Sequence, residues 1–154
     1  LTQYVSLDKL IEQIDFTKPK TISCSYHFPK KDLLKIKKIF KRLKIGIAIN
    51  PENFDKKYIE SIRKIVDVIY FDMNVYRKKS IKKYSLRKSI KQIQFIKSKN
   101  IPVYIGGGID KKNVSNILKQ IIPFGLDISR SLKNQRNLIS KSKLKDFLNQ
   151  ISVG

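Results

Sequence analysis

The stretch IPVYIGGGIDKKNV (101–114) decides the fold, and PFGLDISRSLK (123–133) follows it closely. Each stretch opens with the apolar residues of a strand and ends in small or polar residues that precede a helix. Continuous runs of Ile, Val and Tyr are typical of parallel strands that are buried on both faces. The two stretches therefore predict neighbouring strand–helix units of an α/β protein.

The same alternation extends through the rest of the chain. Apolar spacing predicts helices at 7–14, 36–43, 55–65, about 79–98, 114–121 and 144–151, and strands at 21–28, 44–50, 66–74, 101–109 and 124–129. This order predicts parallel strands joined by right-handed crossovers. Because a closed eight-stranded barrel needs about 250 residues, we expect a single-domain parallel-strand (β/α) barrel over residues 1–154, shortened or incomplete, with about five to six βα units. An open doubly wound sheet has the same periodicity and is the alternative.

The net charge is strongly positive, because 34 Lys and Arg residues stand against 12 Asp and Glu residues, which gives +22. Clustered cations attract phosphate backbones, so one interpretation is nucleic-acid binding. Most of the cations are Lys, however, whereas Arg forms the bidentate contacts of selective phosphate and base recognition. Biased composition of the coding DNA is the favoured interpretation, and nucleic-acid binding is the less favoured one.

Several features bear on the compartment. The single cysteine, Cys24, excludes an internal disulfide and fits a reducing compartment. No apolar run reaches the roughly 20 residues of a membrane helix, and the first ten residues lack a signal-peptide pattern. We therefore expect a cytoplasmic protein without a membrane segment. Leu1 is either an unusual start or an internal residue of a longer chain. No Cys, His and Asp cluster indicates a metal, and no cofactor is expected.

The glycine triplet 106–108 carries the clearest chemical signal. It follows a strand and precedes a helix, with Asp110 as the expected N-cap. Glycines let backbone amides approach a phosphate, and a helix N-terminus adds positive potential. A tight turn is the structural alternative. Barrel enzymes commonly complete such a site from the next loop, where Ser129 and Arg130 offer a hydroxyl and a guanidinium.

Together these motifs resemble the phosphoribosylanthranilate isomerase family. IGGGIDKKNV, PFGLDISRSLK and KSKLKDFL are similar, in order and spacing, to the motifs that end the family's barrel. The resemblance implies that Gly107, Gly108, Ser129 and Arg130 hold the substrate phosphate and that Asp127 faces the sugar. It also implies an Amadori rearrangement of N-(5-phosphoribosyl)anthranilate in tryptophan biosynthesis, with a phosphorylated sugar as substrate and without a cofactor.

The rearrangement needs a general acid and a general base. Counting strands backward from the end of the chain places Asp72 where the family has its acid, at a strand mouth where desolvation raises a carboxyl pKa. The family's base is a cysteine in a strand-one motif, K-x-CGIT, which is absent here. Cys24 is a weak candidate for the base, since a buried small hydrophobe is the favoured interpretation of its mid-strand position.

Other readings stay open. Residues 45–69 also resemble the family's third strand, helix and fourth strand, and in that register Asp72 is not the acid. The family's SGVE is Arg130-Ser131-Leu132-Lys133 here, which allows a degenerate enzyme. Another sugar-phosphate barrel enzyme, such as a ribulose-phosphate 3-epimerase, and a basic nucleic-acid-binding module are the alternative functions. A homo-oligomer, or a partner chain that completes the barrel, is the expected form of any assembly.

Overall fold

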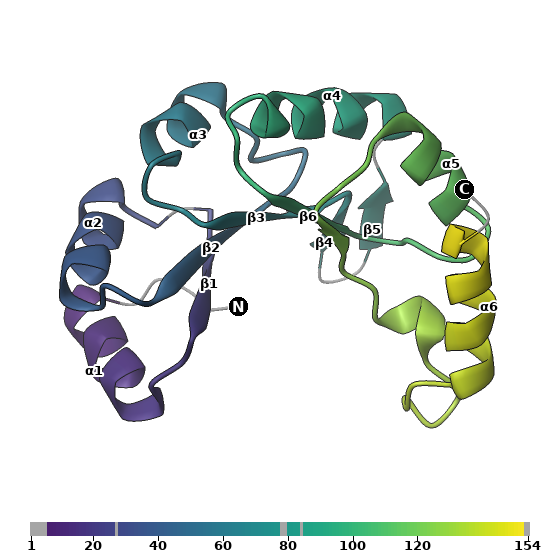
Figure 1. Cartoon of the computed structure of the whole chain (residues 1–154), viewed down its shortest axis with the longest axis horizontal. Coiled ribbons are helices and arrows are strands. Elements are labelled where there is room, and N and C mark those ends of the chain that lie inside the picture. The colour runs from purple at the N-terminus through teal and green to yellow at the C-terminus, as the bar shows by residue number, and fades with distance from the viewer. Residues whose placement is uncertain (1–5, 27, 78–79, 84, 153–154) are drawn as a thin grey trace.

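The computed structural model describes residues 6–26, 28–77, 80–83 and 85–152. Its elements are α1 (Leu7–Thr17), β1 (Thr21–Ser25), α2 (Lys30–Ile39), β2 (Lys44–Ile49), α3 (Lys56–Ile62), β3 (Val68–Asp72), β4 (Asn74–Arg77), β5 (Ser80–Lys83), α4 (Leu86–Lys97), β6 (Val103–Gly106), α5 (Val114–Gln120), β7 (Gly125–Leu126), the 3-10 helix η1 (Arg130–Leu132) and α6 (Lys141–Ser152). The helices follow the outside of an arc, and the sheet lines its inside (Figure 1).

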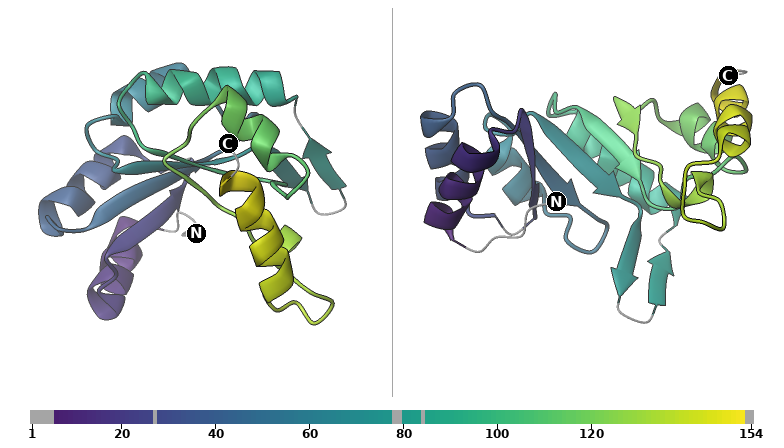
Figure 2. Two further views of the ribbon diagram at one scale, coloured as in Figure 1. Left: turned by 45° about the vertical axis from the view of Figure 1, so that its right-hand side comes forward. Right: turned by 90° about the horizontal axis from the view of Figure 1, so that it is seen from below.

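One parallel sheet organises the chain, in the order β1-β2-β3-β6-β7. Every neighbouring pair in it is parallel, which confirms the predicted α/β class with five strand–helix units. In the described part of the chain, β1 and β7 do not pair with each other. The sheet is therefore a barrel-like arc that stays open, and the further views in Figure 2 show the same open side.

The helix-facing side of the sheet forms the hydrophobic core. Its side chains come from alternate positions of each strand and are buried: Ile22, Cys24, Ile45, Ile47, Ile49, Ile69, Phe71, Val103 and Ile105. Helix residues such as Leu10, Ile14 and Ile93 pack against them. Burying a Leu or Ile side chain contributes about 1.5–3 kcal/mol, so this layer supplies the main stabilisation of the arc.

The concave side of the sheet is only partly covered and carries aromatic rings. Tyr70 and Tyr104 are direct cross-strand partners, and their rings stack with centroids 5.5 Å apart. Each ring lies over a glycine of the strand on its other side, because a Cβ at Gly46 or Gly125 would overlap it. The two glycines therefore leave room for the tyrosines, which pack on an inner face that a closed barrel would fill with side chains.

The predicted long helix at 79–98 is wrong in its first part. The chain leaves β3 into an antiparallel hairpin of β4 and β5, and α4 begins only at Leu86. β-Branched and aromatic residues in β4 and β5 favour strand structure over helix. Ser85 then caps α4, since its Oγ accepts a hydrogen bond from Lys88 N. The last predicted strand is also shorter than the expected 124–129, because only Gly125–Leu126 pairs with β6.

None of the helices in the described ranges combines the length and the apolar character that a membrane-spanning helix requires.

Candidate functional site

A cavity of about 590 Å³ opens at the carboxyl ends of β3, β6 and β7. Ligand sites of small molecules commonly have volumes of roughly 300–1,000 Å³. The residues predicted for catalysis and phosphate binding line it, with the exception of Cys24: Asp72, Gly107, Gly108, Asp127, Ser129 and Arg130. The fold thus brings together residues that lie up to 58 positions apart, from Asp72 to Arg130.

Backbone hydrogen bonds fix the relative positions of the three strand ends. Asp72 pairs with Gly106 across the β3–β6 ladder, and Met73 N donates to Gly106 O over 3.0 Å. On the other side of β6, Asp127 N donates to Ile105 O over 2.8 Å. The carboxylates of Asp72 and Asp127 therefore flank the strand that ends in the glycine loop.

The glycine loop, residues 106–108, packs tightly against residues 72–74 at the end of β3. Gly107 has φ +87°, in the left-handed region that favours glycine. A Cβ there would overlap Asp72 Oδ1 and lie 2.6 Å from Met73 N. At Gly108, with φ +80°, a Cβ would instead lie 2.5 Å from the amide nitrogen of the Asn74 side chain. Glycine is therefore required at 107 by the neighbouring carboxylate and backbone, whatever ligand the loop holds.

The side chains of Asn113 and Ser131 form hydrogen bonds with the backbone of residues 108–110. Asn113 Nδ2 donates to Gly108 O over 2.9 Å, and Asn113 Oδ1 accepts from Asp110 N over 3.0 Å. Ser131 Oγ donates to Ile109 O over 2.8 Å, which joins the glycine loop to η1. Each such bond contributes about 0.5–1.5 kcal/mol. The two halves of the predicted phosphate site are thus connected directly.

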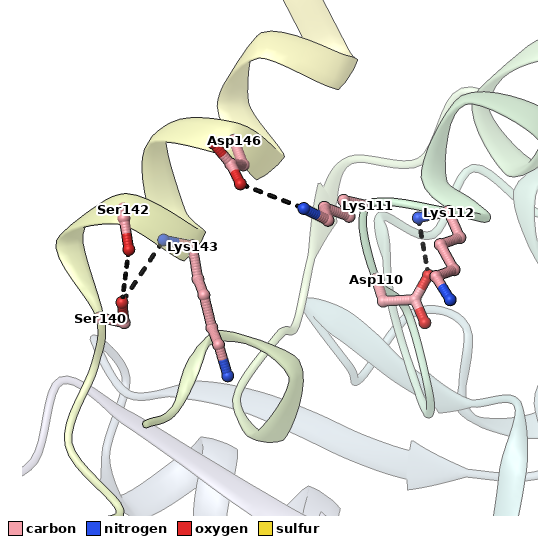
Figure 3. Close-up of polar contacts among 7 residues, drawn as sticks. All are labelled: Asp110, Lys111, Lys112, Ser140, Ser142, Lys143 and Asp146. Atoms are coloured by element: carbon pink, nitrogen blue, oxygen red, sulfur yellow. Dashed lines mark hydrogen bonds and ion pairs between the residues drawn. The ribbon is translucent and has the colours of Figure 1, made fainter. Parts of the chain in front are cut away.

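Asp110 does not cap α5 as the sequence predicted, because the N-cap position falls at Asn113. Its carboxylate instead accepts hydrogen bonds from Lys112 N and Asn113 N, over 2.8 and 3.1 Å. Figure 3 shows the Lys112 contact and, beside it, the 3.1 Å ion pair of Lys111 with Asp146 of α6. The turn before α5 therefore satisfies its own amides and is anchored to the last helix.

The amides that a ligand could use lie elsewhere on the cavity wall. Among the described residues, the backbone N–H groups of Gly107, Gly108, Ile109 and Ser129 donate to no protein acceptor. Amide clusters at glycine-rich loops are typical anion sites. The donors available to a phosphate are therefore these loop amides rather than the start of α5, which has only seven residues.

The cavity is locally acidic although the chain is strongly basic. Among the described residues, Asp72, Asp110 and Asp127 line it, together with a single cation, Arg130. Burial raises the pKa of the half-buried Asp72 carboxyl above its ordinary value, and the negative charge of Asp127 adds to the rise. The Asn74 N–H, 2.9 Å from Asp72 Oδ1, and the charge of Arg130 oppose it. A carboxyl with a raised pKa holds its proton more readily, as a general acid must.

Cys24 does not lie at this site. It belongs to the same alternate set of β1 as Ile22, which faces the helices, and its side chain is fully buried in the core. Burial raises the pKa of its thiol to about 12. A thiol that stays protonated on the outer face of the sheet cannot take a proton from a substrate at the strand ends, so the weak prediction of Cys24 as base finds no support in the geometry.

Three residues around the cavity were not predicted from the sequence in the roles they have: Asn74, Asp110 and Asn113. Asn113 could have been predicted, since an Asp three residues before an Asn favours a local hydrogen-bonded turn. Asn74 could not, because its importance comes from its contact with Gly108, which is distant in the sequence. Within the described residues no group of three or more His, Cys, Asp or Glu side chains could hold a metal ion.

The open parallel sheet and its strand-end cavity define the class of protein: a (β/α)-barrel-like chain with its candidate site at the carboxyl ends of the strands. Within that class the chain resembles phosphoribosylanthranilate isomerases, as its motifs predicted. The curated N-(5'-phosphoribosyl)anthranilate isomerase of Methanococcus maripaludis is 32% identical over 63 residues, which are 41% of this chain and 29% of the relative. No family model matches the chain.

Solved structures extend the likeness to the whole fold. The N-(5'-phosphoribosyl)anthranilate isomerase of Pyrococcus furiosus matches 98% of this chain and 71% of its own, with a TM-score of 0.70 and 19% identity. A phosphoribosyl anthranilate isomerase in complex with reduced 1-(o-carboxyphenylamino)-1-deoxyribulose 5-phosphate matches 99% and 70%, with a TM-score of 0.68 and 13% identity. The sequence match spans less than a third of the curated relative, so the relatives' activity carries over only as a proposal.

Proposed function

We propose that this chain is a phosphoribosylanthranilate isomerase-like enzyme that rearranges N-(5-phosphoribosyl)anthranilate in tryptophan biosynthesis. The observation that carries the proposal is the strand-end cavity, where a carboxyl with a raised pKa, a second carboxylate and a glycine loop with unpaired amides meet. An aminoaldose phosphate needs these three parts: a proton donor, a proton acceptor and an anion site. A relative of the same fold binds a reduced product-like ligand that carries a 5-phosphate.

The phosphate is held by backbone amides and one guanidinium. The loop amides of Gly107, Gly108 and Ser129 and the side chain of Arg130 border the cavity. No Lys belongs to the described part of the lining, so binding depends on the placement of these donors more than on the net charge of the chain. Arg130 also neutralises part of the phosphate charge beside two carboxylates that would otherwise repel it.

Asp72 acts as the general acid and Asp127 as the base. The Asp72 proton goes to the ring oxygen of the ribose, which opens the ring and leaves an iminium between C1 and the anthranilate nitrogen. A base then takes the proton from C2, and the electron pair forms the enolamine that tautomerises to the aminoketose. Asp127 is exposed and lies on the other flank of β6, so the two carboxylates can serve different atoms of one substrate.

The backward strand count is the register that this proposal needs. Asp72 ends the strand that pairs with the glycine strand, and the fold match covers 98% of the chain and 71% of the relative. Both observations support a chain equivalent to the last five units of the relatives' barrel. In that register the cavity contains both the phosphate-binding residues and the general acid of the active site. The proposed substrate is a phosphorylated sugar in the cytoplasm.

Turnover of the fluorescent N-(5-phosphoribosyl)anthranilate by the purified chain tests the proposal. We expect loss of substrate fluorescence in the wild type. Asp72→Asn removes the proton donor but keeps the shape, and general acid catalysis contributes about 10²–10⁴-fold, so its kcat should fall by at least about 100-fold. Asp127→Asn should lower kcat similarly.

Glu12→Gln is the matched control, because it removes an exposed carboxylate on α1, away from the cavity. Its kcat should equal that of the wild type. Activity that survives Asp72→Asn would remove Asp72 from the mechanism. A folded wild type that fails to consume the aldose phosphate would overturn the proposed activity.

A further inference from the structure

A second cavity, of about 790 Å³, lies at the opposite end of the sheet from the candidate active site. Its walls are the two connections that lead from α1 into β1 and from α2 into β2, at residues 18–20 and 40–43. Each wall is a connection between two successive elements of the fold. We call this cavity the basic groove.

The floor of the basic groove is aliphatic. Ile14 and Leu43 are buried at its base, while Phe40 is half-buried. Ile39, the last residue of α2, is 53% exposed, and Pro19 borders the same surface. The exposed Ile39 and the half-buried Pro19 and Phe40 line one concave surface, which is typical of sites that receive apolar side chains.

The rim of the basic groove is cationic. Five of its twelve lining residues are Lys or Arg, compared with 34 of 154 in the whole chain. They are Lys18, Lys20, Lys41, Arg42 and Lys44, and all five are exposed. Within the described ranges, none of their side chains forms an ion pair or hydrogen bond. Asp15 is the one acidic residue in the described part of the lining.

Helix electrostatics explain part of this charge. Cations near a helix C-terminus interact favourably with its dipole, and Lys18 and Lys41 follow the ends of α1 and α2. Lys20 and Lys44 lie further along the chain, at the start of β1 and β2, where a helix dipole does not account for their charge. The two helix dipoles therefore account for only part of the positive charge around the apolar floor.

We propose that the basic groove binds an acidic, amphipathic peptide segment of a partner protein. Aliphatic side chains of such a segment would occupy the floor, and its carboxylates would meet the lysines of the rim. Opposite charge of this kind speeds association and selects partners. Four of the five cations are Lys, and the floor has one aromatic ring, Phe40. A nucleic-acid site would favour Arg forks and several stacking rings.

The groove lies at the amino ends of β1 and β2, whereas the candidate active site lies at the carboxyl ends of β3, β6 and β7. A peptide in the groove would contact the loops before Thr21 and Lys44, whereas the substrate would contact loops after Asp72 and Gly106. The partner can therefore be bound while the strand-end cavity stays open. The inference does not depend on the proposed isomerase activity.

Fluorescence anisotropy with a labelled amphipathic peptide tests the inference. The probe has Leu at i, i+3, i+4 and i+7 and Glu at the other positions, and a scrambled peptide of equal composition disperses the Leu residues. We expect the patterned peptide to bind at least about tenfold more tightly than the scrambled one. The double substitution Lys41→Glu with Arg42→Glu should weaken binding at least about tenfold, and Ile39→Ser should weaken it without lowering the salt dependence.

Lys119→Glu with Lys145→Glu is the matched control, because it changes the net charge equally on exposed positions of α5 and α6. It should change the affinity less than about twofold. Equal losses in the two double variants, or equal binding of the scrambled peptide, would show attraction by net charge alone and overturn the proposal. Tighter binding of a single-stranded RNA or of anionic vesicles, lost in the same groove variants, would assign the groove to that ligand instead.

Discussion

The two cavities at the ends of the sheet differ in charge and in construction. Among the described residues, the strand-end cavity has three carboxylates and one guanidinium in its lining, whereas the basic groove has five cations and one carboxylate. The first joins three strand ends by backbone hydrogen bonds, whereas the second has an exposed rim on two connections, which one backbone hydrogen bond joins, from Lys44 N to Lys20 O. In a chain of net charge +22, the bulk charge therefore says little about the charge of a given site.

The construction of the strand-end cavity predicts the largest effect. Gly107→Ala and Gly108→Ala both place a Cβ at positive φ, which strains the backbone by about 1–2 kcal/mol. Only the first also drives the Cβ into Asp72 Oδ1 and Met73 N, while the second meets the flexible end of the Asn74 side chain. We expect Gly107→Ala to lower the free energy of unfolding by about 2–4 kcal/mol, and Gly108→Ala by less. Urea unfolding measures both.

Equal losses in the two alanine variants would mean that the loop moves freely away from Asp72. The strand-end cavity would then be as adaptable as the basic groove, and the contrast between them would fail.

The acidic character of the same cavity predicts a smaller, pH-dependent effect. The folded state raises the pKa of Asp72, so its ionised form destabilises the fold, and stability falls as pH rises through the folded pKa. Asp72→Asn removes that penalty and keeps an oxygen acceptor for Asn74 N. The variant should therefore be slightly more stable than the wild type at pH 7, and the gain should vanish below about pH 3.9, the ordinary Asp pKa. Thermal unfolding across that range measures it.

A variant that loses both activity and stability at pH 7 would indicate that Asp72 is mainly a structural residue, held by the Asn74 hydrogen bond.

The basic groove predicts the smallest effect on stability. Lys41→Gln with Arg42→Gln removes two exposed cations whose side chains form no ion pair or hydrogen bond in the described part of the chain. Their remaining role is to complement the end of α2, which is worth about 0.3–1 kcal/mol. We expect the free energy of unfolding to change by less than about 1 kcal/mol and to approach the wild-type value as salt is added. A larger loss would make the groove part of the folded framework rather than a docking surface.

Much of the fold could be predicted from local patterns. Amphipathic helices and buried strands have characteristic spacings of apolar residues, and these spacings are visible in the sequence. The glycine and serine loops after the last two strands could also be located from the sequence. The hairpin of β4 and β5 was missed because Lys-rich sequence between Ile81 and Ile90 satisfies helical spacing as well as strand pairing. Short-range periodicity cannot choose between two pairings of similar propensity.

The sequence by itself determined the class of fold, the order of the units and the motifs that resemble an isomerase family. The tertiary structure alone decided which face each strand residue occupies, because alternation assigns two faces but does not say which one meets the helices. It placed Cys24 in the core and Asp72 at the strand ends beside Asp127. It also created both cavities, since each requires loops that are distant along the chain to converge through the parallel pairing of the strands.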